Sequence, residues 1–100
     1  MNTDELIDSV VVWGKSHGIT NPDKQTAKLM EECGELAHEI CRSRYNSDEL
    51  KDAIGDIVVV VTILADMLGI DIRDCYQMAY DTISKRDGES VNGCFIKAND

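Results

Sequence analysis

The feature that most constrains the fold is a run of apolar residues from Ile57 to Ala65, interrupted only by Thr62 and ended by Asp66. On an α-helix this run is apolar all round, so we expect it to be buried on every side. It is far shorter than the ~20 residues that a membrane span needs. The run therefore predicts the core helix of a small all-α protein, covered partly by other helices of the chain and partly by a partner subunit.

Four helical stretches are expected, over about 4–16, 22–42, 48–68 and 72–86. Each is bounded by residues that favour helix ends. These are Gly18 after the first stretch, Asn21 and Pro22 before the second, Ser47 before the third, Gly69 after it, and Asp71 and Gly88 around the fourth. A chain of 100 residues has room for one hydrophobic core, so residues 1–100 are expected to form a single domain.

The last dozen residues, 89–100, follow a different pattern. Asn92 and Gly93 stand between apolar residues, which is a hairpin signal. We expect this segment to form either a small hairpin or an extended tail that packs on a partner subunit.

The chain has a net charge of −9 at pH 7. Such a surface repels the phosphate backbone of nucleic acids and anionic membranes, so we expect neither as a partner. Nucleotides are anions as well, and an acidic protein that handles them needs cations as intermediaries. A bound divalent metal would meet that need.

The four cysteines, at positions 33, 41, 75 and 94, form no Cys-x-x-Cys pair and no zinc-knuckle spacing. Each is expected to be a small buried apolar group. The N-terminus shows no basic stretch followed by an apolar core, so no signal peptide is expected. These features favour a cytoplasmic protein with reduced thiols.

The second expected helix carries an acidic stripe beside its apolar face. At about 100° per residue, Lys28, Glu32, Glu35 and Glu39 lie along one edge of that face. Glu32 and Glu35 are three residues apart and project side by side, and their repulsion costs an isolated helix roughly a few tenths of a kcal/mol. A cation between them would remove the repulsion, since magnesium binds carboxylate oxygens.

The third expected helix carries a second acidic stripe, formed by Glu49, Asp52 and Asp56 within roughly 60° of one another. The stripe continues into apolar residues, so its carboxylates should point toward the interior or an interface. Burying them without partners would cost roughly several kcal/mol, and a metal would supply the partner. A solvated surface is the competing interpretation, and it suits Glu31, Glu39 and Glu49 taken singly better than Glu32, Glu35 and Asp56, which border the apolar face.

The segment from Lys28 to Ala37, which contains a Glu-Glu-x-x-Glu motif, resembles the first acidic helix of the MazG-like nucleotide pyrophosphohydrolases. Asp52 to Val58 resembles that family's second acidic helix, and Leu64 to Asp71 resembles the segment after it. Ser84 to Arg86 resembles the basic end of the family's last helix. The resemblance covers about residues 24–87 and rests on the order of the motifs. It is closest to short, single-domain members like those of phages and Gram-positive bacteria.

The resemblance implies an all-α, four-helix fold that works as a homodimer or homotetramer. It implies cleavage of nucleoside triphosphates between the α and β phosphates, which yields the monophosphate and pyrophosphate. Magnesium is the implied cofactor, with manganese as a substitute. By motif position Glu32, Glu35 and Asp56 would be metal ligands, Glu31 would orient the site or the attacking water, and Glu31 or Glu35 would accept the proton of that water.

One position departs from the family pattern. The family commonly has a glutamate three residues before the aspartate of its second acidic helix, and this chain has Ala53 there. Asp52, one turn before Asp56, is the expected substitute ligand, and Glu49 is the alternative. The number of metal ions is open for the same reason.

Four residues are candidate substrate contacts. Lys28 stands beside the acidic stripe, while Lys85 and Arg86 could neutralise the leaving pyrophosphate or merely complement the helix dipole. Trp13 could stack on the base or could belong to the core.

Two other functions are compatible with the sequence. The missing glutamate at position 53 would suit a non-catalytic helical protein that dimerises through its third helix. The acidic residues would also suit a phosphohydrolase that cuts another nucleotide bond. Metal-dependent release of pyrophosphate separates the proposed enzyme from the first of these, and release of phosphate instead would identify the second.

Overall fold

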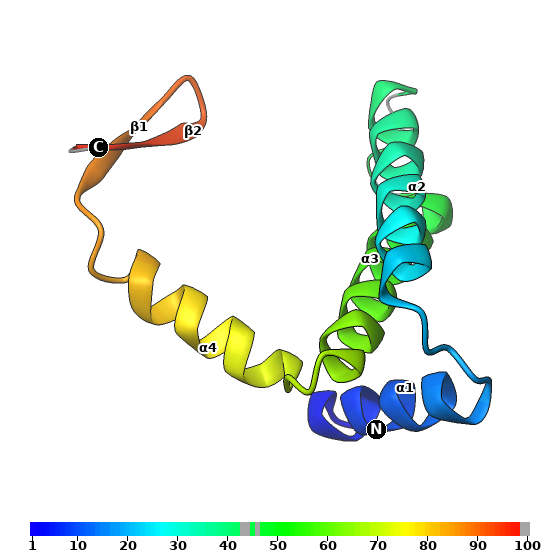
Figure 1. Cartoon of the computed structure of the whole chain (residues 1–100). Helices are drawn as coiled ribbons and strands as arrows, with labels where there is room; N and C mark the ends of the chain where they lie inside the picture. The colour runs from blue at the N-terminus through cyan, green and yellow to red at the C-terminus, as the bar shows by residue number, and fades with distance from the viewer. Residues whose placement is uncertain (43–44, 46, 99–100) are drawn as a thin grey trace.

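The computed structural model describes residues 1–42, 45 and 47–98. It contains four helices followed by a two-stranded hairpin (Figure 1). The elements are α1 (Thr3–Ser16), α2 (Pro22–Cys41), α3 (Asp48–Met67), α4 (Ile72–Ile83), β1 (Gly88–Val91) and β2 (Cys94–Lys97). The expected all-α architecture is therefore confirmed. Helix α4 ends three residues before the expected Arg86.

The helix ends are fixed by the capping residues that the sequence indicates. The side-chain oxygen of Asn21 accepts a hydrogen bond from the Lys24 backbone N–H at 3.1 Å, and Pro22 opens α2. The Ser47 hydroxyl accepts one from the Leu50 N–H in the same way. These bonds satisfy backbone donors that the first helical turn leaves unpaired.

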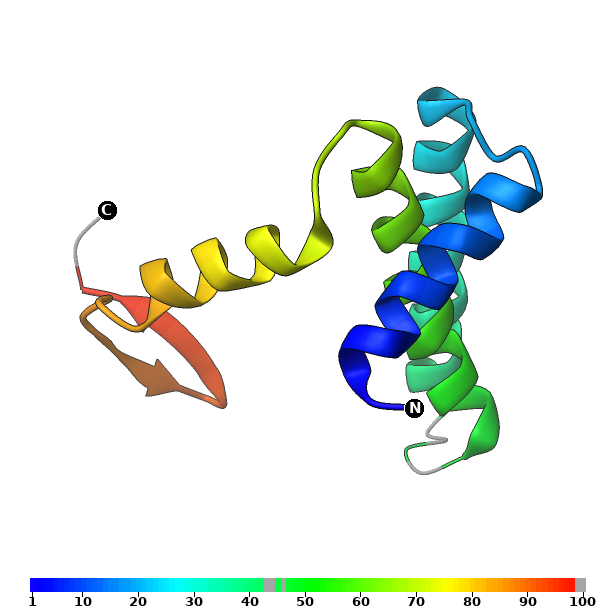
Figure 2. The same ribbon diagram turned by 90° about the horizontal axis from the view of Figure 1, so that it is seen from below.

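The core lies between α2 and α3, which run side by side, with α1 crossing over them (Figure 2). Among the described residues, its buried hydrophobic side chains belong to α3: Ala53, Val60, Ile63 and Ala65. Gly14 of α1 is buried against α3, and a Cβ atom at this position would come within 3.1 Å of Ile63. The missing side chain lets α1 approach α3 closely, and this contact positions the end of α1 beside the core.

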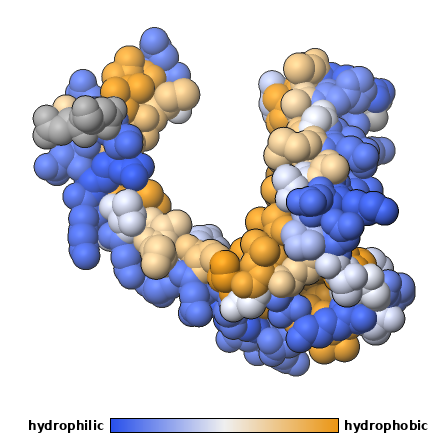
Figure 3. All heavy atoms as spheres, in the orientation of Figure 1, coloured by the Kyte–Doolittle hydropathy of each residue, from blue (hydrophilic) through white to orange (hydrophobic). Residues whose placement is uncertain are grey.

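Helix α4 leaves the rest of the molecule. It makes an angle of 107° with α3, so the chain has the shape of a U with the hairpin at the far end (Figure 1). No residue of α4 is buried within one chain. The radius of gyration is 15.9 Å, compared with about 13 Å for a compact chain of this length. Hydrophobic residues lie along the inner floor of the U (Figure 3).

Two expectations about burial are wrong for the single chain. Val58, in the run expected to be buried on every side, is 54% exposed, because α4 bends away from that face of α3. All four cysteines are exposed, because each lies outside the thin α1–α2–α3 core.

The start of α4 is tied to α1 by one arginine. The Arg73 guanidinium donates to Asp4 at 2.8 Å and to Asp8 at 2.7 Å, both on α1. It also contacts Asp71, the residue that caps α4. The backbone N–H and the charge of Arg73 hold the pKa of Asp71 below its usual value. This ion cluster ties the start of α4 to α1 at the floor of the U.

The hairpin is one of the two forms that the sequence allows for the last residues. Its strands pair antiparallel, with Gly88 opposite Lys97 and Val91 opposite Cys94. Asn92 and Gly93 form the turn, with φ angles of 52° and 81°. Two consecutive positive φ values match the twist of a tight hairpin.

Within the described residues, no single helix is long and apolar enough to cross a membrane, although the bent pair α3 and α4 passes the same test by length and composition alone.

Candidate metal and nucleotide site

Three carboxylates from the two paired helices meet at one point. Glu32 and Glu35 come from α2 and Asp56 comes from α3, and one oxygen of each lies within 4.8 Å of the others. The spacing of three residues places both glutamates on the same face of α2, which packs against α3. The sequence predicted that this set borders the apolar face, and the structure brings the three side chains together.

The cluster is electrostatically unsatisfied. Glu32 is 4% exposed, and its Oε2 atom is buried with no hydrogen-bond partner. Its other oxygen, Oε1, lies 3.2 Å from the Nζ atom of Lys28, whose pKa is raised by that hydrogen bond. The negative charge of Glu32 raises the pKa of Glu35. Burial and the charge of Asp52 raise the pKa of Asp56.

These observations fit a divalent cation. A buried carboxylate oxygen without a donor is costly, and one ammonium group does not neutralise three carboxylates. Hard cations such as Mg²⁺ and Mn²⁺ take carboxylate oxygens as ligands and would offset the repulsion among the three carboxylates. The cluster could therefore hold either ion.

One side of the cluster opens into a cavity of about 550 Å³, here called the acidic cavity. Its lining consists of Glu31, Gly34, Glu35, His38, Glu39, Glu49, Asp52, Ala53 and Asp56. Ala53, where the family pattern has glutamate, is buried in its wall. Asp52 acts on the pKa of Asp56, so it lies within electrostatic reach of the cluster.

The other side opens into a second cavity of about 320 Å³, here called the apolar cavity. It is lined by Trp13, Ile19, Gln25, Lys28, Glu32, Asp56, Val59, Val60 and Ile63. Asp56 lines both cavities. The carboxylate cluster thus forms a partition between an acidic space and a mostly apolar one.

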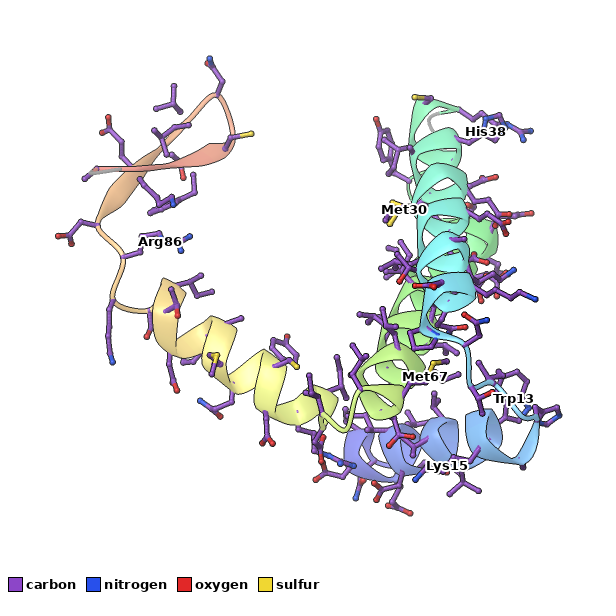
Figure 4. All side chains as sticks on the ribbon, viewed as in Figure 1. Trp13, Lys15, Met30, His38, Met67 and Arg86 are labelled. Carbon is purple, nitrogen blue, oxygen red and sulfur yellow. The ribbon has the colours of Figure 1, made fainter. Side chains whose placement is uncertain are left out.

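The candidate substrate contacts fall into two groups. Trp13 and Lys28 line the apolar cavity. Lys85 and Arg86 follow the end of α4, and Figure 4 shows Arg86 across the U from α2, whereas His38 of the acidic cavity points to the outer side. Within one chain the structure does not bring these two cations to the cluster.

Glu39, which the sequence placed on the acidic stripe but which also suited a solvated surface, lines the acidic cavity and has a buried Oε2 atom with no hydrogen-bond partner. One residue of the site was missed by sequence reasoning. Gln25 is 8% exposed and lines the apolar cavity. A buried glutamine gives no periodic signal, so nothing in the sequence marked it.

A family model described as the MazG nucleotide pyrophosphohydrolase domain matches residues 20–91. An uncharacterised 18.2 kDa protein of Haemophilus phage HP1 is 39% identical over 70 residues, and the match covers 67% of this chain and 42% of that protein. The uncharacterised protein YvdC of Bacillus subtilis is 35% identical over 72 residues, and the match covers 58% of this chain and 68% of that protein. The chain thus spans less than half the length of the phage relative.

Two solved structures share the fold. The Bacillus-conserved MazG protein, a nucleotide pyrophosphohydrolase, superimposes with a TM-score of 0.72 at 25% identity, covering 87% of this chain and 94% of that one. The MazG-like pyrophosphohydrolase of cyanophage S-2L gives 0.65 at 23% identity and covers 97% of each chain. That phage structure holds dGDP and three catalytic Mn²⁺ ions per active site.

Proposed function

Because the chain belongs to the MazG family of nucleotide pyrophosphohydrolase domains, we propose that it hydrolyses nucleoside triphosphates between the α and β phosphates. The products are a nucleoside monophosphate and pyrophosphate. The proposed cofactor is Mg²⁺, with Mn²⁺ as a substitute. The cyanophage S-2L relative, with its bound nucleotide and Mn²⁺, supports this assignment.

The observation that carries the proposal is the convergence of Glu32, Glu35 and Asp56 within 4.8 Å, with a buried oxygen that lacks a partner. A surface patch of acids would be solvated and would not need a cation. This cluster lies between two cavities, and among the described residues Lys28 is the cationic neighbour of Glu32. It suits a metal that in turn binds phosphate.

We assign the chemical roles as follows. A divalent ion, when bound, would neutralise the triphosphate and polarise the phosphorus. Glu31, which lines the acidic cavity beside Glu35, accepts a proton from the attacking water. The water oxygen forms a bond to the α phosphorus, and the bond from that phosphorus to the bridging oxygen breaks. The electron pair leaves with pyrophosphate.

We also propose that the chain works as a homodimer or homotetramer. Helix α4 has no buried residue, and Tyr76 and Met78 on it are 80% and 73% exposed. A contiguous surface of large exposed apolar side chains marks a protein–protein interface. A second copy is the occupant that fits, because the exposed face of α3 and the exposed α4 belong to every chain. Lys85 and Arg86 would then reach the cluster of the other copy.

A nucleotide panel tests the proposed reaction. The eight common NTPs and dNTPs are incubated with the protein and Mg²⁺ or Mn²⁺, and the products are separated by chromatography. Monophosphate and pyrophosphate in equal amounts support the proposal. Intact nucleotides with both metals would exclude an enzyme of this kind, and inorganic phosphate as the first product would exclude α–β cleavage.

A further inference from the structure

We propose that Gln25 is a specificity-determining residue, whose side-chain amide contacts the base of the nucleotide inside the apolar cavity. This inference rests on the proposed function, because it assumes that the phosphates bind at the metal cluster. The phosphates then lie at the carboxylate cluster, the base lies in the apolar cavity, and the Gln25 amide selects the base.

The position of the apolar cavity supports this orientation. Glu32 and Asp56 belong both to the carboxylate cluster and to the cavity wall, so a nucleotide with phosphates at the cluster can direct its base there. The acidic cavity on the other side is lined by six carboxylates. Those acids suit metal-bound phosphates, whereas Ile19, Val59 and Ile63 suit a flat aromatic base.

Trp13 contributes an aromatic surface to the cavity. It is 49% exposed, and its ring is held by His17, with 4.4 Å between the ring centroids. Figure 4 shows it beside the link between α1 and α2. The close contact of Gly14 with Ile63 fixes this end of α1 against α3. The indole is therefore placed for stacking before a nucleotide binds.

Gln25 is the uncharged polar side chain in the cavity lining, and it is held in one orientation. Its Nε2 atom donates to the Val60 carbonyl at 3.1 Å, and within the described chain this is the hydrogen bond that its side chain makes. The residue is 8% exposed. Its Oε1 atom and its second N–H are left for another partner.

The edge of a nucleobase supplies such a partner. An amide offers an acceptor and a donor side by side, which matches the paired donor and acceptor on a base edge. Because Nε2 is already bound to Val60, the amide cannot flip freely, so it distinguishes bases whose donor and acceptor are exchanged. A site built to hydrogen-bond a substrate group discriminates strongly against substrates that lack it.

A purely structural role for Gln25, as a link between α2 and α3, predicts a different pattern of effects. Loss of the link would lower kcat/KM for all substrates by the same factor and would lower the stability of the protein. Loss of a base contact would change the ratios among bases and would leave a substrate without a base unaffected. The experiment therefore compares dATP, dGTP, dCTP, dTTP and the abasic 2′-deoxyribose 5′-triphosphate.

The test variant is Gln25→Leu, with Thr62→Val as the matched control. Thr62 is also buried, and its hydroxyl donates to the Val58 carbonyl, but it does not line the apolar cavity. We expect Gln25→Leu to lower kcat/KM for the preferred dNTP about tenfold or more. For the abasic substrate, kcat/KM should stay within about twofold of the wild-type value. The differences in kcat/KM among the four bases should become smaller. Thr62→Val should keep the wild-type ratios.

Equal losses on all five substrates in Gln25→Leu would overturn the proposal. A second measurement on the wild-type protein covers the case in which the variants do not fold. The side-chain amide signals of Gln25 in an NMR spectrum with Mg²⁺ should shift when a deoxynucleoside monophosphate is added, and not with 2′-deoxyribose 5-phosphate. Unmoved signals would also overturn it. Because this measures binding, its result is independent of whether triphosphates are hydrolysed.

Discussion

Glu35 is the exposed member of the three-carboxylate cluster, and repulsion from Glu32 raises its pKa. We expect Glu35→Gln to remove a metal ligand while the helices remain intact. Metal-dependent turnover should fall about 100-fold or more. Mg²⁺ should raise the Tm of the wild-type protein by binding to the folded state, and this rise should disappear in the variant. Turnover assays and thermal melts with and without Mg²⁺ check this, and a fully active variant would refute the ligand assignment.

Asp52 and Glu49 both line the acidic cavity, but only Asp52 contributes to the raised pKa of Asp56. We therefore predict that Asp52→Asn lowers metal-dependent activity more than Glu49→Gln does. The measurement is kcat/KM over a Mg²⁺ titration for both variants. The reverse order would assign the fourth ligand to Glu49.

The carboxylate cluster could be anticipated at the residue scale, because helical spacing alone places Glu32 beside Glu35. The same helical spacing placed Asp56 beside the apolar face of its own helix. It could not show that Glu39 has a buried oxygen, because that depends on how closely α3 packs against α2. Nor could it pair Gln25 with the Val60 carbonyl, which is 35 residues away in the sequence.

The contact between α1 and α3 depends on the missing side chain at Gly14. We predict that Gly14→Val lowers the free energy of unfolding by about 1–3 kcal/mol, because the added methyl groups press on Ile63. The matched control is Gly55→Ala, also in a helix, where a Cβ atom meets nothing within 4 Å. It should stabilise by about 0.5–1 kcal/mol. Urea unfolding of both variants measures the change in the free energy of unfolding. Changes in the same direction in the two variants would contradict this account of Gly14.

Asp71 gives the start of α4 a pH-dependent contribution to stability. Its pKa in the folded chain lies below the ordinary 3.8, so its charge stabilises the fold above that pH and loses this effect as pH falls through the lowered value. We predict that Asp71→Asn, which keeps a capping side chain, is less stable than wild type at pH 7. The gap in Tm should close below pH 3.8. A gap that is unchanged at pH 3 would show that the charge has no role.

Helix ends were the best-predicted part of the fold, since Asn21, Ser47 and Asp71 cap the helices that follow them. Gly18 and Gly69 have φ angles of 65° and 74°, which glycine adopts without strain. The direction in which α4 leaves α3 could not be predicted. It depends on the Arg73 ion cluster, whose partners on α1 are distant in the sequence.

At the scale of the whole molecule, the exposed face of α4 predicts self-association. We expect the wild-type protein to elute as a dimer or tetramer in size-exclusion chromatography with light scattering. Tyr76→Asp should shift it toward the monomer, because a charge on an apolar interface carries a desolvation cost. Val12→Asp is the control, since Val12 is 65% exposed on α1 and does not line the groove beside Tyr76. A monomeric wild-type protein would contradict the proposal.

The apolar run of α3 correctly indicated that this helix holds the core, but it could not say which chain covers Val58. Hydrophobic periodicity reports that a face avoids water, and it is the same whether the covering helix belongs to this chain or to another. The expectation that the four cysteines are buried was wrong for a related reason: it rested on residue type, which does not say where in the fold a residue lies.

The partition formed by Glu32 and Asp56 has a consequence for ligand design. A heterocyclic fragment has room in the apolar cavity of about 320 Å³, and a metal-chelating fragment has room in the acidic cavity of about 550 Å³. Because Asp56 lines both spaces, a short linker past this residue would join the two fragments into one inhibitor. The linked molecule would gain affinity from the shared attachment without any new contact.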